Sequence, residues 1–182
     1  MALLMTNEMP PIVYEIDLVK KAREYAIKAH GDQMYGENPY VYHLDNVYNK
    51  VKEFSNDPVN HCVAFLHDVL EDTDISFEEL ESEFGLTITK AVNGLSDANG
   101  INRKERKLRT YSKIRTNNVS LQVKLCDRIC NMEESMGNSY SKMYIKEYDS
   151  FKSALYTYPL YSKEWRELDR LYKKMVGNNG KS

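Results

Sequence analysis

The stretch His61-Cys-Val-Ala-Phe-Leu-His67-Asp68-Val-Leu-Glu71-Asp72-Thr-Asp74 sets the interpretation of the whole sequence. An apolar run ends at the doublet His67-Asp68, and Glu71-Asp72 follows two residues later. Positions four apart share a face of a helix, so His67 would lie next to Glu71 and Asp68 next to Asp72. This pattern predicts metal ligands one turn before two free carboxylates. Acidic clusters at helix ends are more often simply solvated, so the prediction depends on further ligands elsewhere in the chain.

Helical patterns extend on both sides of this stretch. Asp57-Pro58 predicts a helix start, since aspartate caps free N–H groups and proline fits the first helical position. Ser76 to Glu79 has the pattern of a capping box, and Gly85 is placed to end the helix that follows. Apolar residues at helical spacing predict helices over residues 17–33, 43–54, 58–70, 76–85, 87–95, 103–116, 119–136, 140–156 and 162–176. No segment alternates as a strand would, and 31–39 is expected to hold a loop, so we predict an all-α bundle.

Length and composition favour one cytoplasmic domain. The 182 residues suffice for one domain with a substantial core but are few for two. We expect a flexible lead-in over residues 1–16, a single domain over 17–176 and a frayed tail over 177–182. Three cysteines without an export signal indicate reduced thiols in the cytoplasm. No apolar run approaches the roughly 20 residues that span a bilayer, so we expect no membrane association.

The charge pattern favours a small-molecule partner. A net charge of −2 argues against binding of polymeric nucleic acid, although it leaves room for a local basic pocket. The basic run Arg103-Lys104-Glu-Arg106-Lys107-Leu-Arg109 is by default a solvated helix face. Its functional alternative is an edge that binds phosphate oxygens. The sequence provides no prediction of the oligomeric state.

Two further ligands lie far from the focal stretch. His43 begins a helix after Pro39-Tyr-Val-Tyr, where a lone histidine is more often a surface or capping residue. Asp127 is the stronger anomaly, because it lies inside the most apolar helix of the chain and carboxylates are rarely buried without a partner. Asn131 follows one turn later on the same face.

Together these positions predict a mixed imidazole and carboxylate metal site. The expected ligands are His43, His67, Asp68 and Asp127. Such a set suits Mn²⁺, Fe²⁺ or Mg²⁺, with Zn²⁺ also possible. An ion of this kind lowers the pKa of a bound water and screens charge on a phosphoryl oxygen. Glu71 and Asp72 would then orient or deprotonate that water.

The motifs resemble those of a known family. The matching segments are Pro39-Tyr-x-x-His43, His67-Asp68-Val-Leu-Glu71-Asp72-Thr and Val123-Lys-Leu-Cys-Asp127-Arg-x-x-Asn131-Met132. Their order and spacing resemble the HD superfamily of metal-dependent phosphohydrolases. The resemblance is closer to the hydrolase domain of the RelA/SpoT family and its small stand-alone relatives. It extends from about Leu18 to about Tyr156.

The resemblance implies a fold, an activity and residue roles. The fold would be the all-α HD-domain bundle, and the activity would be hydrolysis of the 3′-diphosphate of guanosine tetra- or pentaphosphate, usually with Mn²⁺. It implies metal binding by His43, His67, Asp68 and Asp127, and handling of the attacking water by Glu71 and Asp72. It implies substrate contacts by Asn131, Tyr148, Lys104, Arg106 and Lys107.

The sequence departs from the family pattern in the loop before His43. Met34 and Tyr35 stand where family members carry a basic pair that packs on the nucleotide base, so Tyr35 would stack on the base instead. This departure favours an alternative, an HD-type nucleotidase or phosphodiesterase that acts on another nucleotide. A second alternative is a catalytically silent nucleotide-binding module. The complete set of metal-binding and water-handling residues argues against that second alternative.

Overall fold

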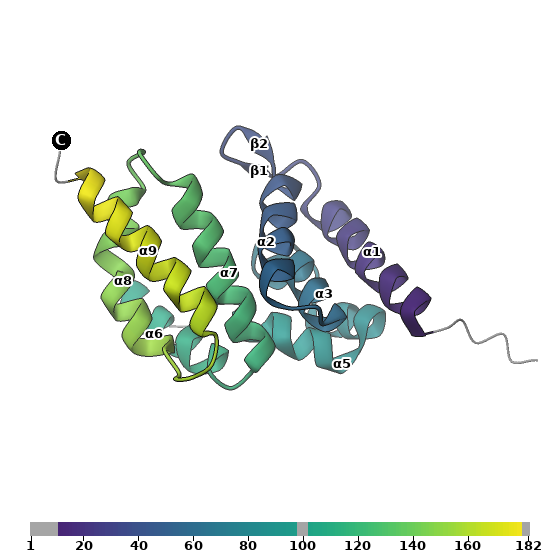
Figure 1. Ribbon diagram of the computed structural model, residues 1–182. Helices are drawn as coiled ribbons and strands as arrows, with labels where there is room; N and C mark the ends of the chain where they lie inside the picture. The colour runs from purple at the N-terminus through teal and green to yellow at the C-terminus, as the bar shows by residue number, and fades with distance from the viewer. Residues whose placement is uncertain (1–10, 98–101, 180–182) are drawn as a thin grey trace, which may run out of the picture.

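Helices build nearly the whole fold, so the all-α prediction is confirmed (Figure 1). The computed structural model describes residues 11–97 and 102–179. Its helices are α1 (Pro11–His30), α2 (Val41–Phe54), α3 (Pro58–Leu66), α4 (Val69–Asp72), α5 (Phe77–Leu95), α6 (Arg103–Ile114), α7 (Asn118–Glu134), α8 (Ser141–Leu155) and α9 (Ser162–Asn179). A short hairpin of β1 (Met34–Tyr35) and β2 (Asn38–Pro39) lies between α1 and α2.

Helix α7 lies at the centre of the arrangement (Figure 1). It packs against α2 and α3 on one side and against α9 on the other. Helix α1 covers α3, and α8 packs on α9. The hairpin lies beside the start of α2, at the top of the view in Figure 1. None of the helices in the described part of the chain combines the length and hydropathy needed to cross a membrane.

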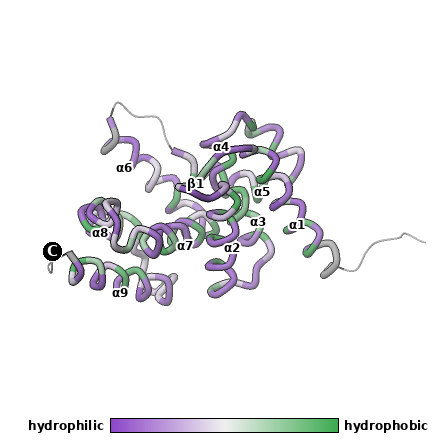
Figure 2. Tube along the Cα trace, turned by 90° about the horizontal axis from the view of Figure 1, so that it is seen from above, coloured by the Kyte–Doolittle hydropathy of each residue, from purple (hydrophilic) through white to green (hydrophobic). Residues whose placement is uncertain are grey.

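The core is a single cluster of buried apolar residues to which α3 and α7 contribute most directly. Phe65 and Leu66 of α3 and Leu125 and Ile129 of α7 are almost completely buried. Figure 2 shows the contrast with α6, which is largely hydrophilic and lies at the edge of the molecule. Because the core helices are so apolar, any polar side chain on them must be paired or must face a site.

The predicted signals for the start and end of helices have the expected effect in the structure. The Asp57 side chain accepts a hydrogen bond from the backbone N–H of Val59, with Pro58 at the first helical position. Ser76 and Glu79 form both halves of the capping box. Gly85 adopts φ 76° and ψ 163°, which separates two helical halves within α5. Such a positive φ is readily available only to glycine, so the predicted helix end at this residue is confirmed.

The ends of the first and last helices differ from the prediction. Helix α1 begins at Pro11, so residues 11–16 are helical rather than part of a flexible lead-in, and the helix predicted from residue 17 starts earlier. Helix α9 continues through residues 177–179 of the expected frayed tail. The sequence did not predict these terminal helical turns because they project from the core. The apolar periodicity that marks a helix is weak in such exposed turns. Residues 1–10 and 180–182 lie outside the described part of the chain.

The predicted helix from Pro58 to Leu70 is divided in two. Helix α3 ends at Leu66, His67 and Asp68 form a turn, and α4 follows. Both turn residues stay in the right-handed region, but Asp68 has φ −101° and ψ −4°, away from ideal helix values. The prediction of one continuous helix was therefore wrong at the functional doublet itself.

The expected loop over 31–39 contains the β-hairpin. Met34 pairs with Pro39 and Tyr35 pairs with Asn38 in antiparallel register. Gly36 has φ 61° at the tight turn between them, a conformation that glycine favours. Two-residue strands are too short to show alternation, so the expectation of no strand was wrong here.

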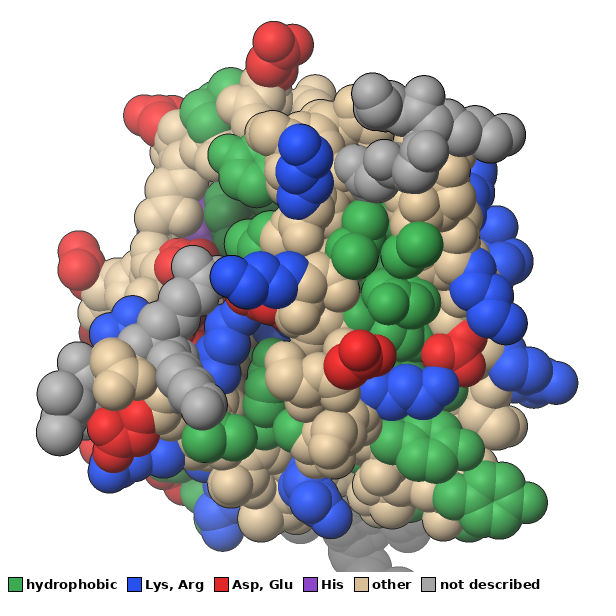
Figure 3. Space-filling view, turned by 90° about the vertical axis from the view of Figure 1, so that its left-hand side faces the viewer, with side chains coloured by type: hydrophobic (Ala, Val, Ile, Leu, Met, Phe, Trp, Pro, Cys, Tyr) green, Lys and Arg blue, Asp and Glu red, His purple; other side chains and the backbone are tan. Residues whose placement is uncertain are grey.

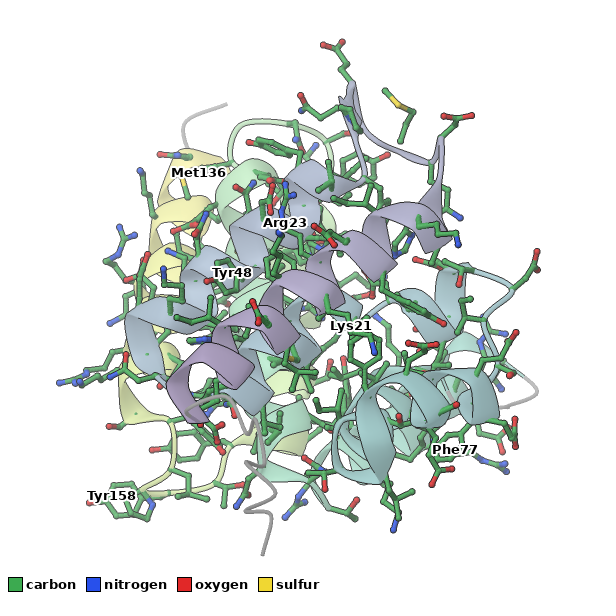
Figure 4. All side chains as sticks on the ribbon, turned by 90° about the vertical axis from the view of Figure 1, so that its right-hand side faces the viewer. Lys21, Arg23, Tyr48, Phe77, Met136 and Tyr158 are labelled. Atoms are coloured by element: carbon green, nitrogen blue, oxygen red, sulfur yellow. The ribbon has the colours of Figure 1, made fainter. Side chains whose placement is uncertain are left out.

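Side-chain contacts fix α1 against its neighbours. The ammonium of Lys21, labelled in Figure 4, lies 2.9 Å from the Glu83 carboxylate and 5.0 Å from the centre of the Phe84 ring on α5. Arg23 makes two hydrogen bonds of 2.7 and 2.8 Å to the Asp45 carboxylate on α2. These contacts hold α1, and with it the start of the hairpin, in place beside α2 and α5.

Gly94 marks the closest approach of α5 and α7. A Cβ atom at Gly94 would lie 2.6 Å from Oγ of Ser120, which is buried and donates to the carbonyl of Ala91. We expect Gly94→Ala to lower the free energy of unfolding by about 1–3 kcal/mol, because relief of the overlap disturbs that hydrogen bond. Thermal or urea unfolding measures the change. Gly177→Ala is the control, because its Cβ would meet nothing within 4 Å. Equal stability of the two variants would contradict the close packing.

Candidate metal centre

His67 is held with one ring nitrogen directed at Asp68. Its Nδ1 lies 2.8 Å from the backbone carbonyl of Ala64, and because a carbonyl only accepts, Nδ1 carries the hydrogen. The second nitrogen, Nε2, is buried without a hydrogen-bond partner and lies 2.9 Å from Oδ2 of Asp68. A nitrogen lone pair and a carboxylate oxygen at this separation need a positive charge between them. A proton or a metal ion would supply it.

His43 and Asp127 converge on the same point. Nε2 of His43 lies 3.8 Å from Oδ2 of Asp68 and 3.5 Å from Oδ1 of Asp127. His43, His67 and Asp68 each offer a ligand atom, and these atoms all lie within 4.8 Å of one another. The first turn of α2, the turn between α3 and α4, and the middle of α7 thus bring together all four predicted ligands.

Neighbouring charges keep both carboxylates ionised. Burial would raise the pKa of Asp127, but the Lys124 ammonium, 2.8 Å from Oδ2, and the two imidazoles hold it well below its usual range. Burial also acts on Asp68, where the charge of His67 outweighs it and lowers the pKa. For His67, burial opposes the charged form, but Asp68 raises the pKa to about 9. This preference for positive charge fits a cation site.

The donor set fits a divalent cation. Two imidazole nitrogens and two ionised carboxylates meet in a buried location, and within the described residues Nε2 of His67 has no hydrogen-bond partner. Imidazole with carboxylate is the ligand mixture of borderline and hard divalent ions. The Ala64 carbonyl orients His67, and the amide of Asn131 donates to Oδ1 of Asp127 at 2.5 Å, as supporting residues do around bound metals.

Three of the four residues, His43, Asp68 and Asp127, line a pocket of about 260 Å³, and His67 lies behind them without lining it. The sequence-predicted residues that line it are His43, Asp68, Glu71, Asp72, Asp127, Asn131, Tyr35 and Lys107. Oε2 of Glu71 accepts the backbone N–H of Asp97 at 3.1 Å, and Oδ2 of Asp72 accepts the Tyr40 hydroxyl at 3.0 Å. Partial burial and the charges of Asp97 and Asp68 raise the pKa of Glu71. Both expected water-handling carboxylates therefore lie beside the metal-ligand candidates.

Tyr35 and Asn131 lie together in the pocket, next to the ligand candidates His43 and Asp127. The Tyr35 ring stacks on His43, with centroids 4.5 Å apart and planes 10° apart. Its hydroxyl donates to Oδ1 of Asn131 at 2.6 Å. One face of Tyr35 is therefore already covered by His43, and a nucleotide base would have to stack on the other face.

The three basic residues predicted on α6 have different positions. Lys107 lines the pocket and pairs with Glu147 of α8. Arg106 is exposed and does not line the pocket, because it lies on the solvent side of α6 next to Lys107. The side chain of Lys104 lies outside the described residues.

Tyr148 does not reach the pocket, which corrects the role implied by the resemblance. Its side chain is buried between α8 and α9, where the hydroxyl donates to Oδ1 of Asp169 at 2.6 Å. Its ring stacks on Tyr172 with centroids 4.2 Å apart. The orientation of α8 about its own axis directs Tyr148 into this helix contact, and a motif match could not reveal that orientation.

Sequence reasoning missed three pocket residues that the motifs themselves contain. Lys124 and Arg128 lie on the face of α7 that carries Asp127, and Tyr40 follows Pro39 in the first motif. The spacing around Asp127 could have revealed the first two, because positions three or four apart share a helix face. Lys124 and Arg128, together with Lys107, form a basic surface of the pocket that we call the basic wall. On the face of the molecule in Figure 3, basic and acidic side chains are interspersed.

Comparison with known proteins places this arrangement in a family. The model of the HD domain family matches residues 22–156, which is most of the chain. The chain belongs to the HD-domain family. Its motif positions His43, His67, Asp68 and Asp127 all lie within the matched region.

Two of the curated relatives carry the name of the same activity. Over 121 residues the chain is 34% identical to the guanosine-3′,5′-bis(diphosphate) 3′-pyrophosphohydrolase of Aquifex aeolicus, covering 63% of this chain and 17% of that protein. Over 106 residues it is 33% identical to the enzyme of the same name, MESH1, of Drosophila melanogaster, covering 57% of this chain and 59% of that protein. The match thus spans less than two thirds of the length of either relative.

Solved structures support the HD-domain fold. A metazoan ortholog of SpoT, reported to hydrolyse ppGpp, superposes with a TM-score of 0.74 at 24% identity, covering 86% of this chain and 94% of that one. The protein lmo0812 of Listeria monocytogenes EGD-e has a TM-score of 0.60 at 20% identity, covering 78% of this chain and 100% of that one. The predicted HD-domain bundle is confirmed.

Removal of one anionic ligand tests the metal centre of this HD-domain protein. We expect Asp127→Asn to weaken Mn²⁺ binding by about 10–100-fold or more, since it deletes a charge that the ion would neutralise. Isothermal titration calorimetry on metal-stripped protein measures the dissociation constant. Asp149→Asn, the same change at an exposed position of α8, is the control. Unchanged affinity in Asp127→Asn would exclude Asp127 as a ligand.

Proposed function

We propose that this chain is a metal-dependent phosphohydrolase that removes the 3′-diphosphate from guanosine tetra- or pentaphosphate. The observation that carries the proposal is the convergence of the four ligand candidates at a pocket with free carboxylates and a basic wall. The names of the relatives support the choice of substrate. The substrate would be a small nucleotide rather than a polymer.

The four ligand candidates would hold the ion through both imidazoles and both carboxylates. A divalent ion bound there would stabilise charge on a phosphoryl oxygen and make a water more acidic. The proposed ion is Mn²⁺, with Fe²⁺, Mg²⁺ and Zn²⁺ as alternatives that metal analysis would separate.

Glu71 and Asp72 would handle the proton of the attacking water. In the reaction, the water oxygen bonds to phosphorus, the bond from phosphorus to the 3′ oxygen breaks, and that oxygen gains a proton as pyrophosphate leaves. The raised pKa of Glu71 brings its proton affinity closer to neutral pH, which favours a general base. Asp72, fixed by Tyr40, would orient the same water.

The basic wall would bind the phosphates. Lys107 extends from α6, and Lys124 and Arg128 extend from α7, and all three line the pocket. Arg128 is held by stacking of its guanidinium over Phe151 at 4.4 Å, so it is pre-oriented for a planar, bidentate contact with phosphate. Asn131 and the free face of Tyr35 would contact the nucleoside.

The domain organisation and the cellular location are part of the same proposal. We propose residues 17–176 as a single domain, which the continuous buried core supports. We also propose a cytoplasmic location, supported by three buried cysteines that form no disulfide with one another.

The proposal is tested by incubating the purified protein and Mn²⁺ with a panel of nucleotides that includes ppGpp. Release of pyrophosphate and GDP from ppGpp is the expected result. Turnover only of nucleoside monophosphates or cyclic nucleotides would favour the HD-type nucleotidase or phosphodiesterase, to which the Met34-Tyr35 departure points. Tight nucleotide binding with no product would identify a silent binding module.

The role of Glu71 is tested by Glu71→Gln. We expect this variant to keep its fold and its Mn²⁺ affinity while kcat falls by about 10²–10⁴-fold, because glutamine cannot accept the proton. Circular dichroism, calorimetry and steady-state kinetics measure the three quantities. Glu78→Gln, at an exposed position in the first turn of α5, is the matched control. Loss of the folded state in Glu71→Gln would show that the residue is structural.

A further inference from the structure

We infer that Tyr40 is a positioning residue whose hydroxyl holds a metal-ligand carboxylate and a water-handling carboxylate in one arrangement. The inference rests on the proposed function. Tyr40 directly precedes α2 and lies three positions before His43. Its hydroxyl lies 2.6 Å from Oδ2 of Asp68 and 3.0 Å from Oδ2 of Asp72. A single O–H group therefore bridges two carboxylates that would otherwise repel each other.

Asp72 depends on this contact for its orientation. It is the last residue of α4, a helix of four residues, and its side chain is exposed. A single helical turn has little stability of its own, and an exposed carboxylate samples several rotamers. Within the described residues, the Tyr40 hydroxyl supplies the only side-chain hydrogen bond to the Asp72 carboxylate. Loss of that hydroxyl would free Asp72 to turn away from the pocket.

Two residues hold Tyr40 in place: His30, the last residue of α1, and Gln33, which follows α1. Its ring stacks on His30, with centroids 4.2 Å apart and planes 14° apart. Its backbone N–H donates to the carbonyl of Gln33 at 3.0 Å. The Gln33 amide donates to the backbone carbonyl of Asp72 at 2.6 Å, and its oxygen accepts from Nδ1 of His30 at 2.8 Å. These contacts form a brace that binds both the backbone and the carboxylate of Asp72.

A phenol suits this position better than a charged donor would. A phenol ordinarily keeps its proton near neutral pH, and at 2.6 Å from Oδ2 of Asp68 the Tyr40 hydroxyl is placed to donate it. A lysine in its place would bring a positive charge next to the ligands and would repel the cation. The neutral hydroxyl orients Asp68 through Oδ2 without adding a positive charge to the site.

Tyr40→Phe tests the inference, because it removes the hydroxyl and leaves the ring that stacks on His30. We expect Mn²⁺ affinity and kcat each to fall by about 10–100-fold while KM changes less, as is usual when an outer partner of a ligand is lost. Calorimetry with Mn²⁺ and steady-state kinetics with ppGpp measure these quantities. Tyr42→Phe is the matched control, because its ring is 43% exposed and does not line the pocket. Wild-type Mn²⁺ affinity and kcat in Tyr40→Phe would overturn the inference, as would loss of the fold by circular dichroism.

A double-mutant cycle with Asp72→Asn separates positioning from a purely structural role. If the hydroxyl acts on catalysis through Asp72, Tyr40→Phe should cost less in kcat when Asp72 is already asparagine. The loss in Mn²⁺ affinity, which runs through Asp68, should be equal in both backgrounds. Additive losses in kcat would overturn the role through Asp72. If the wild-type chain binds Mn²⁺ but hydrolyses no nucleotide, the proposed function fails while the affinity comparison still tests the contact with Asp68.

Discussion

The structure depends on one contact inside the apolar core, in which the imidazole nitrogen lone pair of His67 faces the carboxylate of Asp68. Nε2 of His67 and Oδ2 of Asp68 lie 2.9 Å apart at the junction of α3 and α4. Helices α3 and α7 both contribute to the core, and the polar groups around this contact come from the start of α2, the turn after α3 and the middle of α7. Buried ionised groups are tolerated only when they are paired or bind a metal. A cation in this location would therefore stabilise the fold and serve the chemistry together.

The break between α3 and α4 gives this contact its geometry. The carbonyl of Ala64 is one of the last of α3, where carbonyls lack helical partners, and the His67 ring satisfies it. That hydrogen bond directs the other ring nitrogen to the site. The short α4 then carries Glu71 and Asp72 to the rim of the pocket. An unbroken helix would have left no turn from which both members of the doublet face His43.

Charges of both signs line the pocket. The pocket is lined by the carboxylates of Asp68, Glu71, Asp72 and Asp127 and by the basic wall of Lys107, Lys124 and Arg128, which meets the carboxylates where Lys124 lies 2.8 Å from Asp127. Glu147 of α8 pairs with Lys107 and lies 3.6 Å from Nη1 of Arg128, so it balances this wall when no anion is bound. A phosphate group entering the pocket would compete with Glu147. This arrangement favours multiply charged anions, which offer more than one oxygen to the wall.

The sequence by itself determined the helical class, the caps at Asp57 and Ser76, the helix break at Gly85 and the four ligand candidates. These follow from local rules, since periodicity, capping and a carboxylate in an apolar helix are all readable along the chain. Only the tertiary structure decided the turn at His67-Asp68, the β-hairpin and the orientation of Tyr148 away from the pocket. It also decided that Tyr40, Lys124 and Arg128 line that pocket. Each of these features depends on which face of a helix or hairpin contacts a segment that is distant in sequence. Tertiary packing between the elements sets that face.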